Sequence, residues 1–384
     1  MNAHHAVPTL GVEEEFLLVH PDTGRQIARG EQVAEYAKDA FGVGLDTELS
    51  AAQVETNTAV CHDLDEVREQ LGALRSVAAE SARRADARLL AVGAPPLGGL
   101  RSEVSDDPRY QRLHEDYRML AEEQSICGCH VHVAVPDPEI AVQVGNHLRQ
   151  WLPVLSLLTA NSRYAQGRDT GYASWRSVVW SRWPSAGPPP YFESLEHYER
   201  TTTMLTESGA ARDERMVYWD VRPSSRLPTV EVRVSDVAAT VDEAVLLAAL
   251  TRALVTTALG DLHRGVRAAP VPVEWLRTAT WRAARDGLAG QALDVCSGRL
   301  VPARLLVDRL CDRVHDALRA SGDLALVERL LTALKDDGTG SERQHRTFLD
   351  TGDPAGVVHE LATRTLTGCD QGTPAVPEAL REKP

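Results

Sequence analysis

Three short apolar segments of the chain each carry two polar side chains at positions i and i+2. In a β-strand such side chains point to one face of the sheet, about 6.6 Å apart. Each segment therefore presents a polar pair to one surface while its valines pack behind. The pairs are Glu13 with Glu15 in GVEEEF, His130 with His132 in CHVHV, and Glu231 with Arg233 in VEVRV, and a fourth segment, QVETNT, adds Glu55 with Gln53 on the same face.

These residue types suit a site for hard divalent cations. Two carboxylates about 6.6 Å apart are too distant to chelate one ion comfortably, but they fit two ions about 3.5–4 Å apart. Carboxylates with an imidazole favour Mg²⁺ or Mn²⁺ over zinc, and a neighbouring arginine can contact phosphate held by the same ions. One pair alone would fit an edge strand with its polar side in water. Three pairs together favour a site for two or more metal ions.

The segment CGCHVH, residues 127–132, also contains the residue types of zinc sites. In an extended strand Cys127 and Cys129 face one side of the sheet, whereas His130 and His132 face the other. Four tetrahedral ligands cannot converge from opposite faces, so the spacing disfavours structural zinc. In a cytosolic chain the cysteines are expected to be reduced and mostly buried.

Nucleotide binding would have to occur without a phosphate-binding loop, because neither GxxxxGK[ST] nor GxGxxG after a strand occurs. Metal ions would then hold most of a bound triphosphate. The segment DGTGSERQHR, residues 337–346, contains glycine and is basic. As a phosphate cradle it is a weak signal, and a surface loop is the preferred interpretation.

Residues 161–190 combine four arginines with Trp, Tyr, Gly and Pro in an otherwise acidic chain. Such a segment fits a pocket for phosphate and a substrate carboxylate, with Arg168 and Arg176 as candidates. The alternative is a rigid aromatic loop whose arginines reflect the chain's strong preference for arginine over lysine. Farther on, Arg222 is followed by Pro223, and a fixed turn there would hold the guanidinium just before the Glu231 strand.

The elements that must position these residues mix strands and helices without regular βαβ alternation. We therefore expect an α+β fold with a mostly antiparallel sheet, in a single catalytic domain spanning 1–384, with a core at about 10–350 and a loosely attached tail over 352–384. Strands are predicted at 9–20, 49–60, 88–97, 125–135 and 229–237; helices at 34–41, 63–89, 108–124, 138–162 and 241–262; and 274–334 is predicted to be almost entirely helical.

Composition narrows the choice of partners and location. The formal charge of −14 disfavours nucleic acid and anionic membranes as partners, since both favour a basic face. No uncharged apolar run of eighteen or more residues is present, and the N-terminus does not have the pattern of a secretory signal. A cytoplasmic protein acting on small molecules is expected.

Six segments in order resemble the carboxylate–amine ligases known as glutamate–cysteine ligase type 2, in the glutamine-synthetase-like superfamily. The match runs from about residue 10 to 346 through GVEEEF, QVETNT, CGCHVHV, QGRDTGYASWRS, WDVRPSSRLPTVEVRVSD and GTGSERQ. The resemblance implies a curved, mostly antiparallel sheet forming a metal-lined funnel flanked by helices. It also implies a homodimer.

The resemblance assigns a role to each candidate residue. Glu13, His130 and Glu231 would surround one Mg²⁺ ion and Glu15 with Glu55 a second, with Glu48 as a lesser candidate. His132 and Arg233 would lie beside the nucleotide and its phosphates. Arg233 and Arg168 would act as catalytic groups on the transferring phosphoryl group. Arg176 and Arg222 would bind the carboxylate of the amino acid.

The implied reaction is an ATP-dependent ligation through an acyl phosphate, with glutamate and cysteine giving γ-glutamylcysteine, ADP and phosphate. The shielding loop of glutamine synthetase has no counterpart here, which leaves the acceptor amine open. Two alternatives remain: a metal-dependent amide hydrolase using the same cluster to activate water, and a catalytically silent protein that binds nucleotide or metal.

Overall fold

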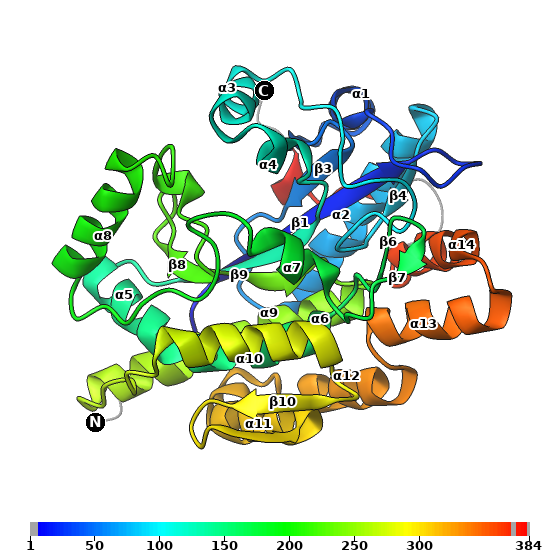
Figure 1. Ribbon diagram of the computed structural model, residues 1–384. Coiled ribbons are helices and arrows are strands. Elements are labelled where there is room, and N and C mark those ends of the chain that lie inside the picture. The colour runs from blue at the N-terminus through cyan, green and yellow to red at the C-terminus, as the bar shows by residue number, and fades with distance from the viewer. Residues whose placement is uncertain (1–6, 370–373, 382–384) are drawn as a thin grey trace.

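Seven strands form one sheet through the middle of the protein, whose computed structural model describes residues 7–369 and 374–381 (Figure 1). Neighbouring strands follow the order β2-β3-β1-β5-β9-β8, and β4 also pairs with β1. All of these pairings are antiparallel, which confirms the predicted fold class. The strands are β1 Leu10–Val19, β2 Asp46–Thr47, β3 Gln53–Asn57, β4 Arg88–Leu90, β5 Gly128–Ala134, β8 Val221–Pro223 and β9 Thr229–Asp236.

The two faces of this sheet differ in chemistry because side chains alternate along each strand. We call the face that carries Glu13 and Glu15 the front face. The opposite, back face carries Val12, Val131 and Val232, each 1% exposed or less. Apolar packing on the back therefore fixes which way the polar pairs point.

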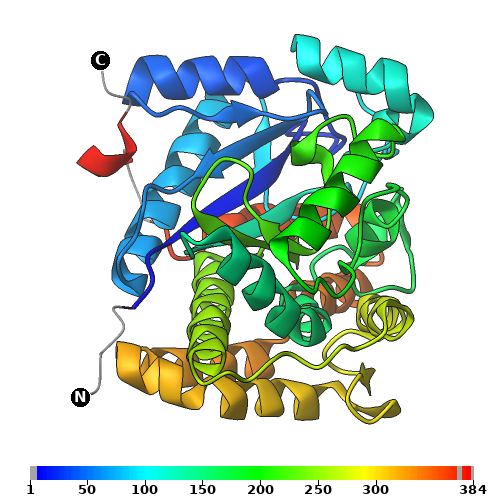
Figure 2. The same ribbon diagram turned by 90° about the vertical axis from the view of Figure 1, so that its left-hand side faces the viewer.

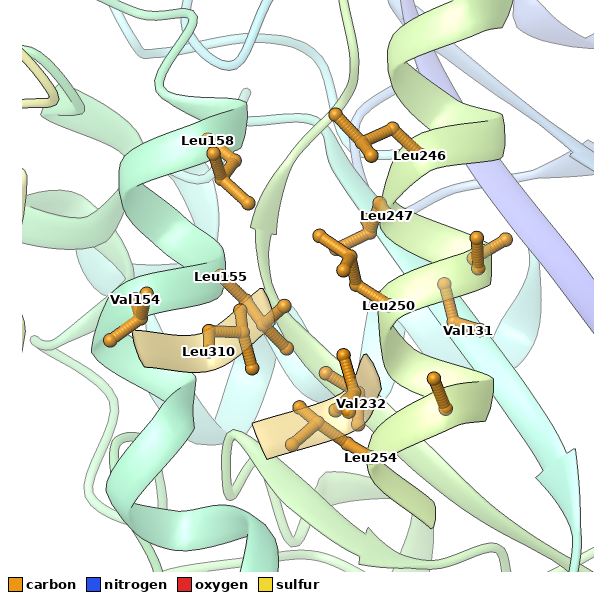
Figure 3. Packing of buried hydrophobic residues seen from close by; sticks show 14 of the residues in the cluster. Val131, Val154, Leu155, Leu158, Val232, Leu246, Leu247, Leu250, Leu254 and Leu310 are labelled. Carbon is orange, nitrogen blue, oxygen red and sulfur yellow. The ribbon is translucent and has the colours of Figure 1, made fainter. Parts of the chain in front are cut away.

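Helices cover the back face and form the main hydrophobic core. Leu155 and Leu158 of one helix and Leu247 and Leu250 of another meet there in front of Val232 (Figure 3). Burial of each such side chain contributes roughly 1.5–3 kcal/mol. The helices in this core include α2 Leu64–Arg84, α5 Pro138–Leu148, α6 Leu152–Thr159, α9 Val241–His263, α11 Ala303–Ser321 and α12 Leu324–Asp337.

Helix α9 is long and apolar enough to cross a membrane by length and composition, with a mean hydropathy of 1.5 over its most apolar stretch. That stretch is 72% buried inside the protein. The helix packs against the sheet and against α11, which lies along the bottom of the molecule (Figure 2). The apolar surface of α9 is therefore explained by its packing in the hydrophobic core.

The region 274–334 departs from the prediction. Helix α10, Val273–Asp286, is followed by a hairpin of β10, Gln291–Asp294, and β11, Arg299–Pro302, before the chain returns to helix. The other elements are α1 Gly30–Phe41, α3 Pro108–Tyr117, α4 Met119–Glu122, β6 Tyr164–Ala165, β7 Arg168–Asp169, α7 Trp175–Trp180, α8 Leu195–Glu207, α11 Ala303–Ser321, α12 Leu324–Asp337, α13 Gly340–Thr351 and α14 Pro354–Thr365, with short 3-10 turns at Arg149–Trp151, Glu214–Met216 and Glu378–Leu380.

The predicted surface loop at 337–346 is also different in the structure. Thr339 caps α13 in a capping box with Glu342, and the first turn of the helix is buried. Gly340 packs against Asn161 so closely that a Cβ would clash with that side chain. A glycine at position 340 therefore allows the start of α13 to pack closely against Asn161.

The prediction of a loosely attached tail after residue 352 is wrong for α14. Its residues Val357, Val358 and Leu361 are at most 4% exposed and lie in the core cluster beside β1 and β4. The hydroxyl of Thr365 accepts a hydrogen bond from the backbone N–H of Ala91. A single domain over the whole chain remains a prediction.

Candidate active site

The register of the sheet places the predicted polar residues directly opposite one another on the front face. Directly opposed residues in an antiparallel pair have Cβ atoms about 4.5–5.5 Å apart, close enough for their side chains to share a ligand. The opposed pairs are Glu13 with His130 across β1 and β5, Glu15 with Glu55 across β1 and β3, and His132 with Glu231 across β5 and β9.

A bulge in β9 sets the position of Arg233. Between the pairs Val131–Val232 and Cys129–Ser235 the register shifts, so that β9 contains one residue more than β5. The guanidinium of Arg233 then reaches both strands, with Nη1 3.4 Å from Nδ1 of His130 and in contact with the Glu231 carboxylate. A bulge commonly redirects a side chain at a functional site in this way.

Three groups of side chains on this face could each hold a cation, because their ligand atoms lie within 4.8 Å of one another. Glu13 and Glu55 each belong to two of them, so the groups form one connected cluster. The groups are Glu13 with Glu55 and His130, Glu13 with His132 and Glu231, and Glu15 with Glu48 and Glu55.

This grouping differs from the predicted one. His132, and not His130, joins Glu13 and Glu231, because the register places His132 opposite Glu231. Its Nε2 lies 3.0 Å from Oε1 of Glu13. His130 instead joins Glu55, with Nδ1 3.1 Å from Oε2 of Glu13. The i, i+2 spacing identified the residues, whereas their partners depended on strand register.

The carboxylates of the cluster have opposing electrostatic environments. Burial disfavours the charged form of Glu13, but hydrogen bonds with His130 and His132 outweigh it and hold the pKa of that carboxyl well below its usual range. Burial, together with the charge of Glu15, raises the pKa of Glu48 to about 8. Burial and neighbouring carboxylates likewise hold the pKa of Glu55 well above its usual range. A divalent cation would relieve this crowding of like charges.

Arg222 is engaged with protein groups. Its Nε donates to Oε2 of Glu231 at 2.9 Å, and its Nη1 donates to the carbonyls of Arg215 and Val217 at 2.9 and 2.7 Å. These bonds fix the Glu231 carboxylate and, with Arg233, hold its pKa well below the usual range against the effect of burial. The structure therefore favours positioning of Glu231 over the predicted contact with a substrate carboxylate.

Arg176 lines the cavity, whereas Arg168 does not. Arg176 is 2% exposed and lies beside the bulge, with long hydrogen bonds of 3.4 and 3.5 Å to the carbonyls of Arg233 and Val234. Its guanidinium passes so close to Gly128 that a Cβ there would clash. Arg168 sits on the exposed strand β7, outside the residues that line the cavity. The structure thus gives no support to Arg168 as a catalytic residue.

The cavity over the front face has a volume of about 670 Å³, in the range of small-molecule sites. Its lining also includes residues that the sequence did not single out. Trp180 and Trp183 belong to the aromatic segment 161–190, for which the sequence predicted a pocket. Helix α3, which provides Arg109 and Tyr110, contains no motif that indicates a role in the site. The additional lining residues include Asn57, Arg109, Tyr110, Trp180, Trp183, Arg215, Tyr218 and Arg226.

Solved structures show the same fold at low sequence identity. Glutamate–cysteine ligase from Francisella tularensis, in complex with AMP, superposes with a TM-score of 0.74 at 15% identity over 97% of this chain and 91% of that one. A bifunctional glutathione synthetase from Pasteurella multocida has a TM-score of 0.65 at 14% identity, over 94% of this chain and 52% of that one. These similarities establish the fold.

Sequence relatives are much closer. A Nocardia farcinica protein with the provisional name glutamate–cysteine ligase 2-1 is 54% identical over 362 residues, 94% of each chain. A Mycolicibacterium smegmatis protein, provisionally named glutamate–cysteine ligase 2-3, is 48% identical over 360 residues, 94% of this chain and 98% of its own. The family model for glutamate–cysteine ligase family 2 matches residues 9–363. The chain therefore belongs to the glutamate–cysteine ligase family 2.

Proposed function

We propose that this protein is an ATP-dependent carbon–nitrogen ligase that joins the γ-carboxyl of glutamate to the amine of cysteine, giving γ-glutamylcysteine, ADP and phosphate. The observation that carries the proposal is the cluster of three overlapping carboxylate and imidazole groups with Arg233 at its edge. Family membership and the names of the relatives support the choice of substrates. The AMP in the Francisella tularensis enzyme supports an adenine nucleotide.

The donor set fits magnesium. All donors in the three groups are carboxylate oxygens or imidazole nitrogens, which suits Mg²⁺ or Mn²⁺ and lacks the thiolates typical of structural zinc. Burial and the crowding of Glu15, Glu48 and Glu55 raise the pKa of Glu48 to about 8 and hold that of Glu55 well above its usual range, so a bound cation would offset the repulsion among these carboxylates. When bound, such ions would neutralise charge on the triphosphate and orient it.

The reaction would proceed in two displacements. A glutamate γ-carboxylate oxygen bonds to the γ-phosphorus of ATP while the bond to the bridging oxygen breaks and ADP leaves. The amine nitrogen of cysteine then bonds to the acyl carbon, the bond to phosphate breaks, and phosphate leaves with its electron pair as the amine loses a proton. Amide formation thereby consumes one phosphoric anhydride bond.

The chain's own side chains contribute charge and position. Arg233 lies at the edge of the cluster, where a transferring phosphoryl group would develop negative charge. Arg222 holds Glu231 in place, and Arg176, which is buried beside the bulge and lines the cavity, could contact a substrate carboxylate. The aromatic residues Trp180 and Tyr218 form a wall that limits water around the reacting groups.

The test is a product screen by mass spectrometry with ATP, Mg²⁺, glutamate and a mixed pool of amines including cysteine. The proposal expects γ-glutamylcysteine, with ADP release that requires both amino acids. Amide cleavage in the absence of ATP would establish the hydrolase instead. Nucleotide binding with no turnover across the pool would establish the silent binding protein. A cytoplasmic location and a homodimer remain predictions from the sequence.

A further inference from the structure

A second, smaller cavity lies behind the catalytic one, at the end of β9 and against α7 and α10. Its volume is about 150 Å³. Two of its lining residues, Arg176 and Trp180, also line the catalytic cavity, so these two side chains form a wall between the two spaces. Tyr172 and Trp281 lie among its other lining residues, Trp281 being 46% exposed.

Four of the side chains around this cavity carry a buried polar atom with no hydrogen-bond partner in the described part of the chain. The atoms are Nε of Arg176, Nε1 of Trp180, Oδ2 of Asp220 and Oγ1 of Thr280. Arg176 is 2% and Asp220 3% exposed. Buried polar atoms without partners are uncommon and costly, so four of them around one small space indicate a polar ligand.

The chemistry of these atoms is complementary to a zwitterion. Arg176 and Trp180 offer N–H donors, and Thr280 offers a hydroxyl, all suited to a carboxylate. Asp220 offers the only carboxylate among the lining residues. No side chain of the described residues lies close enough to Asp220 to form a salt bridge, and burial raises its pKa to about 7 against the opposing charges of Arg176 and Arg233. An ammonium group would supply the missing counter-charge.

The remaining walls suit a short apolar side chain. Val178, Pro188, Val234 and Ala284 line the cavity with carbon, and Trp281 gives an aromatic face toward which a cation is attracted. An apolar cavity of about 150 Å³ holds a benzene-sized molecule. The ligand should therefore have about six or seven non-hydrogen atoms, the size of alanine, serine or cysteine.

We propose that this cavity is a binding site for a small α-amino acid, with its ammonium on Asp220 and its carboxylate toward Arg176, Trp180 and Thr280. The occupant lies on the opposite side of the Arg176–Trp180 wall from the catalytic cluster. Binding requires no ATP and no metal ion, and it does not depend on the reaction proposed above.

The experiment is isothermal titration calorimetry of the whole protein at pH 8, without nucleotide or metal, using L-alanine, L-serine and L-cysteine under reducing conditions. At least one should bind in the millimolar range or tighter. Ethylamine lacks the carboxylate and propionate lacks the ammonium, so both should bind at least about tenfold more weakly, the cost of losing a charged hydrogen bond. Equal binding of propionate and alanine would overturn the proposal, as would no binding by any amino acid.

Substitutions of single residues test whether the amino acid binds in the smaller cavity. Thr280→Val and Asp220→Asn should each weaken binding by about tenfold or more, since each removes a hydrogen bond to a charged ligand group. Thr278→Val is the matched control, because Thr278 lies on the same helix, is exposed and bonds only the carbonyl of Glu274. Glu231→Gln, in the catalytic cluster, should leave this binding intact. Loss of binding in Glu231→Gln together with normal binding in Thr280→Val would place the ligand in the catalytic cavity and overturn the proposal.

Discussion

Glu14 and Arg75 form a bidentate ion pair in which both side chains are 0% exposed, with Nε 2.9 Å from Oε2 and Nη2 2.5 Å from Oε1. Glu14 is the middle glutamate of the EEE triplet and points to the back face, opposite to Glu13 and Glu15. Arg75 also donates to the carbonyls of Ala238 and Thr365 at 2.8 and 3.1 Å. One guanidinium thus ties β1 to α2, to the end of β9 and to the C-terminal helix α14.

Removal of one partner should destabilise the fold strongly. Glu14→Gln and Arg75→Met should each lower the free energy of unfolding by about 3–5 kcal/mol, because the other charge would stay buried without compensation. Urea denaturation monitored by circular dichroism measures this. Arg83→Met on the same helix is the control, since Arg83 is exposed and solvent screens its pair with Glu80, so its removal should change stability little. A loss of similar size in all three variants would contradict this account.

Loss of a carboxylate from the metal cluster should lower the rate of catalysis. Glu13→Gln removes a charge shared by two of the metal groups, and Glu231→Gln removes one held by two arginines. Both should lower the rate of ATP turnover by about 100-fold or more, since charge stabilisation at a reacting phosphoryl group is lost. Circular dichroism should show a folded protein. Near-normal turnover in either variant would remove the metal cluster from the mechanism.

The sequence predicted the faces of the sheet but could not predict the pairing across it. Alternation alone places Glu13 and Glu15 on one face, and this follows from local sterics. Which histidine meets Glu231 depends on a register that is set by distant turns and by the bulge at Arg233. Single residues such as Glu14 have no periodic partner, so a role in a long-range ion pair leaves no local signal.

Other differences have similar causes. The sequence predicts helix at the β10–β11 hairpin because the few residues of the hairpin lie between two amphipathic helices whose apolar pattern dominates the region. Arg168 and Arg176 lie in similar sequence surroundings, yet Arg168 lies on an exposed strand and Arg176 is buried beside the bulge. The arginines therefore indicate a cationic segment, but the sequence does not tell which of them is buried in the site, because that depends on the tertiary fold.

Gly128 is required by the close approach of Arg176. A Cβ on Gly128 would clash with the guanidinium of Arg176, which lies over the Trp180 ring and donates to two carbonyls of β9. Gly128→Ala should therefore displace Arg176 and raise the KM for the carboxylate substrate, with a smaller effect on ATP. Gly145→Ala is the matched control, since a Cβ there meets no atom within 4 Å. Unchanged kinetics in Gly128→Ala would show that Arg176 does not contact substrate.

Asp220 should make the protein less stable as the pH rises, because the pKa of its buried carboxyl is raised in the folded state. Its pKa is about 7 in the folded protein because of burial, and about 3.9 in an unfolded chain. The folded state then binds more protons between these values, so stability is lost as the pH rises toward 7. Asp220→Asn should raise the free energy of unfolding by a few kcal/mol at pH 8 and by little near pH 4, at about 1.4 kcal/mol per pKa unit.

An acid with the opposite shift serves as the control for this pH dependence. Hydrogen bonds from Arg109 outweigh burial and lower the pKa of Asp213, so Asp213→Asn should lower stability at pH 8 and have less effect at low pH. Urea denaturation of the three proteins across the pH range measures both differences. Parallel curves for Asp220→Asn and the parent protein would mean that the Asp220 carboxylate has a partner.

Magnesium should stabilise the protein through the shared carboxylates. A ligand that binds only the folded state adds about 2.7 kcal/mol at a hundred times its dissociation constant, so Mg²⁺ should raise the melting temperature and EDTA should reverse the rise. Glu55→Gln, which alters two of the three groups at once, should lose most of that gain. Without metal it should melt at the parent temperature or above, because it removes one of the crowded charges near Glu48. Glu115→Gln, on the exposed side of α3, should respond to Mg²⁺ as the parent does, and an equal response in Glu55→Gln would show that the ions bind elsewhere.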